Sequence, residues 1–411
     1  MGGCKKCPKQ LTNLRFGCLL TPMITRSKKA FLVALTPLLF LGFQACTKKQ
    51  SGGNNAVVGD EIIIGEYGSM TGSESTFGVS TDKGIKMAVE EANEKGGVKG
   101  KKLRVIVYDD QGKADEAVTT VTKLITQDKA TIILGEVASS RSIAAGAVAQ
   151  RFKIPMVSPS STNPKVTELG DYIFRVCFID PFQGSVMAKF AINNLKLKKS
   201  AIFRDIKSDY SVGLANYFIE EYKKLGGEIV SDVAYSSGDL DFKSQLTAIK
   251  SKKPEIIFVP GYYTEVGLIA RQARELNLKA VLLGGDGWDS EKLTEIGGKA
   301  IEDGYFSNHY SPEDQNPVVQ NFVNRYKSKF GEVPNGLAAM GYDAAIVSID
   351  AMNRATELTP KAIRDALAQT KNFQGVTGII TINEERNAVK PAVVLKVTGP
   401  QQLKYVTTIN P

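Results

Sequence analysis

The chain has 411 residues, of which 43% are hydrophobic and 23% are charged. This balance is typical of a folded globular protein, and the length fits two domains better than one. The formal net charge of +9 is local, because seven lysines and arginines lie among residues 1–45, which contain no acid, and subtracting these seven leaves +2 for the rest. No basic surface suited to nucleic acid is therefore expected on the folded part.

The first recognisable segment is basic and then apolar. Arg26–Lys29 carries positive charge, and Ala30–Gly42 is an apolar run of signal-peptide length. Pro37 and the short length make this run a poor membrane span. We therefore predict a signal peptide over residues 1–45. Met23 gives a more compact start, so residues 1–22 are expected to be an upstream extension or a wrong start.

A polar tether, residues 46–59, begins with Cys46 directly after the apolar run. The arrangement resembles a bacterial lipoprotein signal, in which this cysteine is acylated and becomes the mature N-terminus. Phe43 and Gln44 depart from the usual site, and an ordinary secretory signal cut nearby is the alternative. With Cys46 acylated, Cys177 is alone and no intramolecular disulfide is expected.

From residue 61 the pattern alternates between strand and helix. The first series has expected strands at 61–65, 103–108, 131–134 and 155–158, with helices at 81–95, 115–127 and 140–152. The second has helices at 181–195, 211–225, 241–251 and 265–276, with strands at 200–204, 228–235, 255–259 and 280–284. This alternation predicts an α/β fold with two doubly wound, Rossmann-like lobes and parallel sheets. Further helices are expected at 317–330, 336–355 and 360–370, followed by short strands over 376–411.

Hydroxyl side chains follow two neighbouring strands of the first series. Ser139 and Ser140 come after strand 131–134 at a helix start, where free N–H groups and the helix dipole suit a carboxylate. A simple helix cap explains them equally well. The second cluster, after strand 155–158, contains Ser160, Ser161 and Thr162. Because ligands bind at the carboxyl ends of such strands, two adjacent clusters favour a binding site over a plain turn.

The second lobe offers an acid at a strand end. Asp286 lies between Gly285 and Gly287, where small neighbours let a carboxylate approach a ligand ammonium closely. A turn aspartate is the alternative interpretation. Tyr210 and Tyr262 also stand at the edges of helices or strands in this lobe, although isolated aromatic residues more often belong to the core or rim.

Motifs for catalysis, metal binding and cofactor binding are not found. The mature part contains no HExxH, no GxSxG and no Walker loop, and its single histidine is His309. The glycines of Gly65–Gly72 do not have dinucleotide-binding spacing. We therefore expect no catalytic residues, no metal and no cofactor, and we do not expect an enzyme. An enzyme using the serine-rich edge is disfavoured because no base stands near those serines in sequence.

Several short motifs, in this order and spacing, resemble the periplasmic binding proteins of branched-chain amino acid uptake systems, which have the type I solute-binding fold. The motifs that carry the resemblance are Gly68-Ser-Met-Thr-Gly72, Tyr108-Asp-Asp110, Pro159-Ser-Ser-Thr162, Phe174-Arg175 and Gly285-Asp-Gly287. The resemblance implies two discontinuous lobes joined by three crossovers near residues 179, 309 and 378. Lobe I is then 60–179 plus 310–378, lobe II is 180–309 plus 379–411, and the two close on a ligand.

The resemblance also implies roles for the residues named above. The ligand carboxylate is expected to bind Ser139, Ser140 and Thr162, and the ammonium to bind Ser160, Ser161, Thr162 and Asp286. The well-known leucine binders have Glu in place of Asp286. Side-chain contact and closure are expected from Phe77, Tyr210, Tyr262 and Trp288, the last of which is expected to narrow the side-chain pocket.

The expected function is that of a solute receptor. It is a monomeric lipoprotein of the periplasm or cell surface that captures a branched-chain or similar amino acid and delivers it to the permease and ATPase of an ABC transporter. The alternatives are a ligand-sensing regulatory module on the same fold and a binder of a small amide or carboxylate without an amine.

The signal pattern yields a direct test. Dual acylation gives stable membrane attachment, so Cys46→Ser should move most of the protein from the membrane fraction to the soluble fraction. Fractionation with immunodetection measures this. Cys177→Ser is the matched control, and it should leave the membrane fraction unchanged. Equal membrane retention of Cys46→Ser and wild type would contradict acylation at Cys46.

Overall fold

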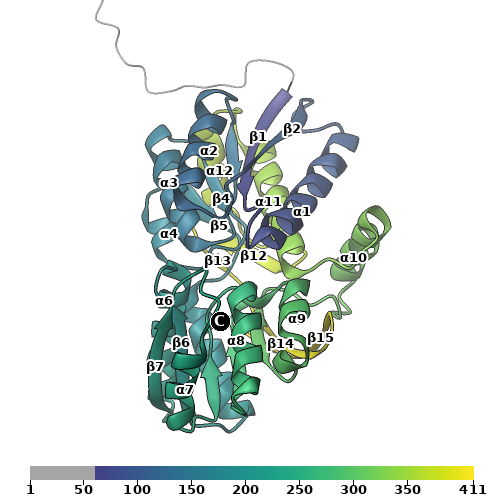
Figure 1. The fold of residues 1–411 in the computed structure, drawn as a ribbon. Coiled ribbons are helices and arrows are strands. Elements are labelled where there is room, and N and C mark those ends of the chain that lie inside the picture. Colours follow the sequence, from purple (N-terminus) through teal and green to yellow (C-terminus); the bar gives the residue numbers. More distant parts are fainter. Residues whose placement is uncertain (1–60) are drawn as a thin grey trace, which may run out of the picture. The chain divides into compact units, whose positions relative to one another are not determined.

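The computed structural model describes residues 61–411, so the predicted signal peptide, the tether and Cys46 lie outside the described residues. Two sheets, each between layers of helices, make up most of the described chain, and a small third sheet completes it (Figure 1). We call the first sheet with its helices lobe I and the second lobe II. The predicted α/β class with parallel sheets is confirmed. No helix among residues 61–411 is long and apolar enough to cross a membrane.

The sheet of lobe I has five parallel strands in the order β2-β1-β3-β4-β5. The strands are β1 (Glu61–Gly68), β2 (Lys102–Asp109), β3 (Ile132–Leu134), β4 (Met156–Ser158) and β5 (Ile173–Arg175). The helices are α1 (Ser75–Glu94), α2 (Ala114–Thr126), α3 (Ser139–Phe152), α4 (Lys165–Glu168), α11 (Gly336–Arg354) and α12 (Pro360–Ala368). Alternate residues of β1 face opposite layers: Ile62 and Ile64 pack with α1 and α11, whereas Ile63 and Tyr67 pack with α2 and α3.

The sheet of lobe II has seven strands in the order β15-β14-β10-β9-β8-β6-β7. Five are parallel: β6 (Lys199–Asp205), β7 (Glu228–Tyr235), β8 (Ile256–Phe258), β9 (Val281–Gly284) and β10 (Tyr305–Asn308). An antiparallel pair, β14 (Ala392–Gly399) and β15 (Gln402–Ile409), extends the edge. The helices are α5 (Asp180–Lys189) with a π turn (Phe190–Asn194), α6 (Asp209–Lys224), α7 (Lys243–Ser251), α8 (Tyr263–Glu275) and α9 (Glu291–Gly297), with 3-10 turns at Asp286–Trp288 and Gly298–Ile301.

The third sheet belongs to the core of lobe I. It consists of β11 (Phe373–Gly375), β12 (Gly378–Ile382) and β13 (Ala388–Val389), and it follows α10 (Pro317–Phe330), α11 and α12 in the chain. Ile380, Ile382 and Ala388 are buried in the same cluster as α1 and α11. The expected boundary at residue 378 put β12 and β13 in lobe II, whereas the structure packs them into lobe I. A strand's alternating pattern shows which face is buried but not which core receives it.

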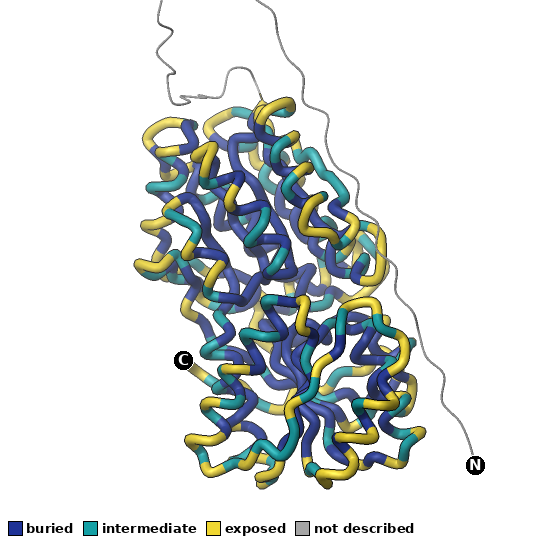
Figure 2. The backbone as a smooth tube through the Cα atoms, turned by 60° about the vertical axis from the view of Figure 1, so that its left-hand side comes forward, coloured by how far each residue is buried: buried dark blue, intermediate teal, exposed yellow. Residues whose placement is uncertain are grey.

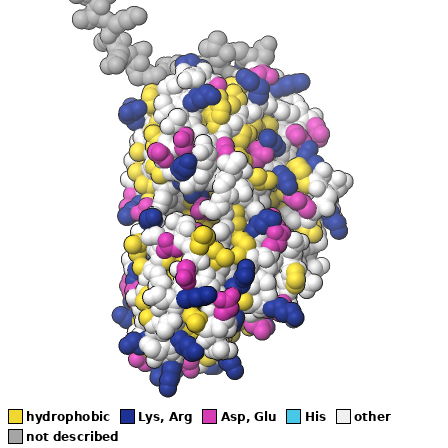
Figure 3. All heavy atoms as spheres, viewed as in Figure 1, with side chains coloured by type: hydrophobic (Ala, Val, Ile, Leu, Met, Phe, Trp, Pro, Cys, Tyr) yellow, Lys and Arg dark blue, Asp and Glu magenta, His cyan; other side chains and the backbone are white. Residues whose placement is uncertain are grey.

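Buried residues lie along the strands of both sheets, and exposed residues lie on the outer loops and helix faces (Figure 2). On the face drawn in Figure 3, basic and acidic side chains are interspersed over both lobes. The expected helix 81–95 begins earlier, at Ser75, because Phe77 and Gly78 are buried in its first turns. The strand β5 and the short helices α4 and α9 had no predicted counterpart.

Close packing of α1 on α11 gives a stability test. A Cβ at Gly84 would lie 2.0 Å from the carbonyl oxygen of Ala338, so Gly84→Ala must push the two helix backbones apart. We expect a loss of about 1–3 kcal/mol in the free energy of unfolding, as for other overpacked sites. Urea denaturation measures it, with Val79→Ala at an exposed position of the same helix as the control. Equal stability of the two variants would contradict the close contact.

Candidate functional site

A small cavity lies between the two lobes. Its lining residues are Phe77, Val137, Ser160 and Leu337 from lobe I and Tyr210, Tyr262, Asp286 and Gly287 from lobe II. Since several lining residues directly follow β3, β4 and β9, the cavity stands at the carboxyl ends of strands, where open α/β sheets bind ligands.

Aromatic rings form one wall of the cavity. Phe77 of α1 meets the edges of Tyr262 and Tyr263, with ring centroids 5.4 and 5.1 Å apart. Tyr210 stacks on Tyr262 with centroids 5.3 Å apart and planes 4° from parallel. Phe77, Val137 and Leu337 belong to the same buried apolar cluster as residues of lobe II. The two lobes therefore contact each other around the cavity through apolar surface.

Ser160 and Asp286 meet across the cavity. Ser160 Oγ, after β4, donates to Asp286 Oδ2 at 3.3 Å, and both residues are buried. The glycines beside Asp286 are sterically required, because a Cβ at Gly285 would lie 2.4 Å from Tyr210 Oη and one at Gly287 would lie 2.7 Å from the carbonyl oxygen of Gly261. Asp286 thus has room to reach the cavity only because its neighbours lack side chains.

The other predicted hydroxyls serve the framework in this structure. Ser139 Oγ accepts from the backbone N–H of Asn163 at 3.2 Å, and Ser161 Oγ donates to the carbonyl oxygen of Glu136 at 2.9 Å. Thr162 is fully buried, and none of these three lines the cavity. Ser139 and Ser161 join the segment after β3 to the loop after β4, so these two serines support the site without lining it.

Ser140 makes a contact between the lobes. Its Oγ donates to Asp209 Oδ2 at 2.9 Å and accepts from the backbone N–H of Asp209, also at 2.9 Å. Asp209 is the first residue of α6 in lobe II. The Ser140 hydroxyl therefore satisfies a free N–H at the start of a helix in the opposite lobe, and it does not line the cavity.

Trp288 is not brought to the cavity. It is completely buried, its Nε1–H donates to the carbonyl oxygen of Val259 at 3.0 Å, and its ring packs near Phe306 in the core of lobe II. The turn Asp286–Trp288 places Asp286 at the cavity and Trp288 against the sheet. The expected narrowing of the side-chain pocket by Trp288 is thus not seen.

Four residues that contribute to the site were not predicted from the sequence. Val137 and Leu337 line the cavity, and Gln183 and His309 bond to Asp286. Val137 could have been predicted as a site residue, because it lies in the loop after β3, two residues before the predicted Ser139. Leu337 begins α11 far along the chain, and no local pattern marks it as a site residue.

A comparison with known families gives one match that spans most of the chain, to the periplasmic binding protein model over residues 61–401. The chain belongs to this family. A curated relative, the Leu/Ile/Val-binding protein homolog 3 of Brucella melitensis, is 30% identical over 338 residues, 81% of this chain and 90% of the relative.

Solved structures agree with this assignment. The leucine binding protein LivK of Thermotoga maritima has 42% sequence identity and a TM-score of 0.82, covering 85% of this chain and 99% of that one. The LivJ protein of Streptococcus pneumoniae, solved with isoleucine, has 34% identity and a TM-score of 0.79, covering 84% of this chain and 99% of that one. The predicted type I solute-binding fold is confirmed.

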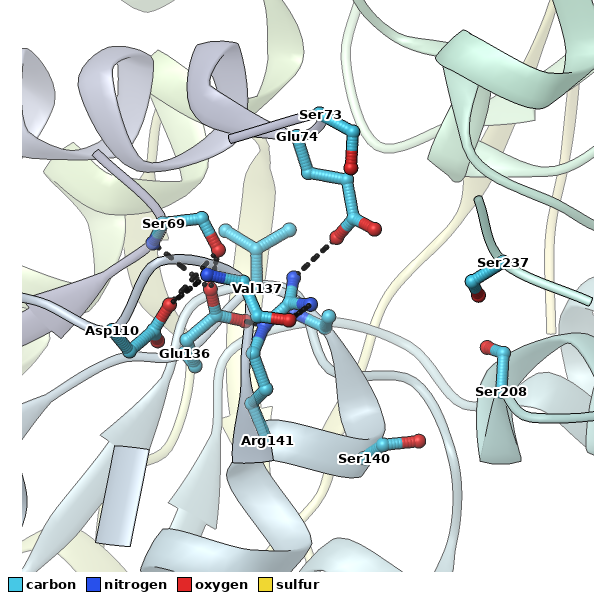
Figure 4. Close-up of polar contacts among 12 residues, drawn as sticks. Ser69, Ser73, Glu74, Asp110, Glu136, Val137, Ser140, Arg141, Ser208 and Ser237 are labelled. Carbon is cyan, nitrogen blue, oxygen red and sulfur yellow. Dashed lines mark hydrogen bonds and ion pairs between the residues drawn. The ribbon is translucent and has the colours of Figure 1, made fainter. Parts of the chain in front are cut away.

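This binding protein also has a buried network of charged side chains beside the loop that leads into α1 (Figure 4). Arg141 of α3 pairs with Glu74 at 2.5 Å and with Glu136 at 3.1 Å, and Figure 4 shows its guanidinium between the two. Ser69 Oγ lies within hydrogen-bond distance of both Glu136 Oε1 (2.9 Å) and Asp110 Oδ1 (3.0 Å), and its single proton is donated to one of them at a time. Each charge is therefore paired or hydrogen-bonded, as burial requires.

The network positions the loop that leads into α1. Glu74 directly precedes this helix, whose Phe77 lines the cavity. On the other side of the loop, the carbonyl oxygen of Ser73 accepts from Thr264 Oγ1 of lobe II at 2.6 Å. Arg141 thus fixes the loop to α3 while the loop contacts the opposite lobe.

Burial changes the titration of Asp110 and of Cys177. It raises the pKa of Asp110 to about 7, with the charge of Glu136 acting in the same direction. It also raises the pKa of the free thiol of Cys177 to about 12, so this cysteine stays protonated. Among residues 61–411 there is no cluster of His, Cys, Asp and Glu able to hold a metal ion.

The raised pKa of Asp110 predicts a pH dependence of stability. Between pH 4 and 7 the folded protein keeps a proton on Asp110 that the unfolded chain has released, so this residue costs more stability as pH rises. Asp110→Asn removes that cost, and its stabilisation should be about 1–3 kcal/mol larger at pH 8 than at pH 5. Denaturant melts at both pH values measure this.

Asp109 provides the contrasting control. Partial burial acts to raise the pKa of Asp109, but hydrogen bonds from Thr71 and backbone N–H groups outweigh it, and the pKa is lowered. Asp109→Asn should therefore destabilise the protein equally at pH 5 and pH 8. If Asp110→Asn behaved in the same way, the burial effect on Asp110 would be refuted.

Proposed function

We propose that this protein captures a small amino acid with an apolar side chain outside the cytoplasm and delivers it to an ABC permease. The observation that carries the proposal is the position of Asp286, a buried carboxylate at a small cavity whose other walls are largely apolar. A buried negative charge is costly unless a positive group pairs with it, and the ammonium of an amino acid is such a group.

The remaining walls suit the other parts of an amino acid. Phe77, Val137, Leu337 and Tyr262 offer the apolar surface that a branched side chain would bury. Ser160 adds a hydroxyl to the lining, and Val137 lies just before the start of α3, where free N–H groups favour an anion such as the α-carboxylate. The leucine-type names of the relatives and the isoleucine bound to the pneumococcal structure support this ligand class.

Binding is proposed to occur by closure of the lobes. Asp286 of lobe II and Ser160 of lobe I line the cavity from opposite sides, so one small ligand reaches both only when the lobes are together. Contacts outside the cavity accompany this arrangement: Ser140 with Asp209, and Ser73 with Thr264.

The family and the N-terminal pattern support a cellular setting for this role. The protein is proposed to be a monomer that acylation of Cys46 holds at a membrane surface, in the periplasm or on the cell surface, beside the permease and ATPase that receive its ligand. In this role the protein binds and releases its solute unchanged, without catalysis.

The central test is Asp286→Asn. A charge-assisted hydrogen bond contributes about 1.5–3 kcal/mol, so the affinity for L-leucine should fall by roughly 10- to 150-fold in calorimetric titration. Binding of 4-methylpentanoate, which lacks the amine, should not weaken. The matched control is Asp303→Asn, an exposed aspartate of lobe II paired with Lys396. It should bind L-leucine as wild type does.

A thermal melt beside the titration separates binding from folding. If Asp286 were only a turn residue, Asp286→Asn would lower the melting temperature while the folded protein kept its affinity. An affinity for L-leucine within threefold of wild type would remove Asp286 from the ammonium site and favour a carboxylate or amide ligand without an amine.

A further inference from the structure

We propose that His309, together with Gln183, is a positioning residue that holds the carboxylate of Asp286 in the orientation in which it receives a cationic ligand group. The inference rests on the proposed function for the nature of the ligand. The arrangement of the three side chains stands independently of it.

Asp286 accepts hydrogen bonds from three separate segments of the chain. Gln183 Nε2 of α5 lies 2.8 Å from Oδ1, while His309 Nε2, directly after β10, lies 3.0 Å from Oδ2. Ser160 Oγ, from lobe I, also approaches Oδ2, at 3.3 Å. A carboxylate offers about four lone-pair positions. These three donors therefore leave room for one further donor while preventing rotation of the carboxylate.

The imidazole of His309 is itself held firmly. Its side chain is completely buried, and its ring stacks on Phe178 with centroids 3.8 Å apart. Nδ1 has no hydrogen-bond partner within the described chain. Because a carboxylate oxygen can only accept, Nε2 must carry the proton that faces Asp286.

The charge of the donors matters more than their number. Burial lowers the pKa of His309 below its usual 6.5 and Lys390 acts in the same direction, while Asp286 opposes them only partly. His309 is therefore neutral at pH 7, and its contact with Asp286 is a hydrogen bond between a neutral ring and a carboxylate. Gln183 and Ser160 are also uncharged. All three donors orient Asp286 and leave its negative charge for the ligand.

A cationic side chain in place of His309 would act differently. A lysine or arginine would form an ion pair with Asp286 and compete with the ligand for it. Removing the donor instead would free the carboxylate to rotate. The entropy cost of fixing its orientation would then make ligand binding weaker. We therefore expect His309→Leu to weaken L-leucine binding by about 2- to 13-fold. His309→Gln, which keeps a side-chain N–H, should retain more affinity than His309→Leu.

The first arm of the test needs no ligand. His309 is the single histidine of the chain, so histidine-selective ¹⁵N labelling of the full-length, untagged protein gives one imidazole. NMR at pH 7.5 should show the neutral ring with its proton on Nε2. The titration midpoint should lie below 6.5, and it should fall further in Asp286→Asn. A proton on Nδ1, or a midpoint near 6.5 that is the same in both proteins, would overturn the proposal.

The second arm separates positioning from general damage to the fold. Calorimetric titration with L-leucine is run on His309→Leu in the wild-type and Asp286→Asn backgrounds, beside thermal melts. A positioning residue acts through Asp286, so His309→Leu should have little further effect once Asp286 is neutral. Equal losses in the two backgrounds would overturn the proposal. If wild type bound no amino acid, the proposed function would fail, and the NMR arm would still decide the role of His309.

Discussion

The structure depends on one constraint, the need to satisfy a carboxylate that is buried where two lobes meet. Asp286 is 5% exposed, and its hydrogen-bond donors come from the loop after β4, from α5 and from the end of β10. Two of these places adjoin crossings between the lobes, since α5 follows the first and His309 precedes the second. The acceptor at the cavity is therefore held by the segments that join the lobes, and its geometry is tied to how those segments lie.

A second buried charge system supports the opposite wall. Arg141 is paired with Glu74 and Glu136, so the loop before α1 is attached to α3 by ionic contacts. Buried ion pairs are weak stabilisers, because desolvation offsets much of their attraction, but losing one partner is costly. Their clearest consequence here is geometric, since they fix the loop from which Phe77 enters the cavity.

The alternation of strands and helices could be predicted because periodicity reports local burial. Four of the five parallel strands of lobe II, all except β10, and most helices follow that pattern closely. Asp286 was also predictable, since glycines on both sides of an acid at a strand end mark a close approach. Other assignments required tertiary knowledge. Ser139 and Ser161 look like ligand groups in sequence, but their hydroxyls bond to backbone groups of neighbouring loops. The direction of a side chain after a strand depends on the turn, which also explains the position of Trp288.

Contacts between residues far apart in the chain could not be predicted from the sequence. His309 was visible as the single histidine, but its role depends on meeting Asp286 and Phe178 in space. Leu337 reaches the cavity because α11 packs closely on α1 through Gly84. The placement of β12 and β13 in lobe I likewise follows from α11, which offers them an apolar surface.

The pair formed by Ser140 and Asp209 has an energetic consequence. In the lobe closure proposed above, Ser140 bonds to the N-terminus of α6 when the lobes are together, and water can replace it at little cost when they are apart. Such a contact adjusts the fraction of molecules already in the competent conformation, and apparent affinity scales with that fraction. Two receptors with identical cavities can therefore differ in how tightly they hold the same solute. Natural variation at the rim can tune uptake to solute scarcity while selectivity stays unchanged.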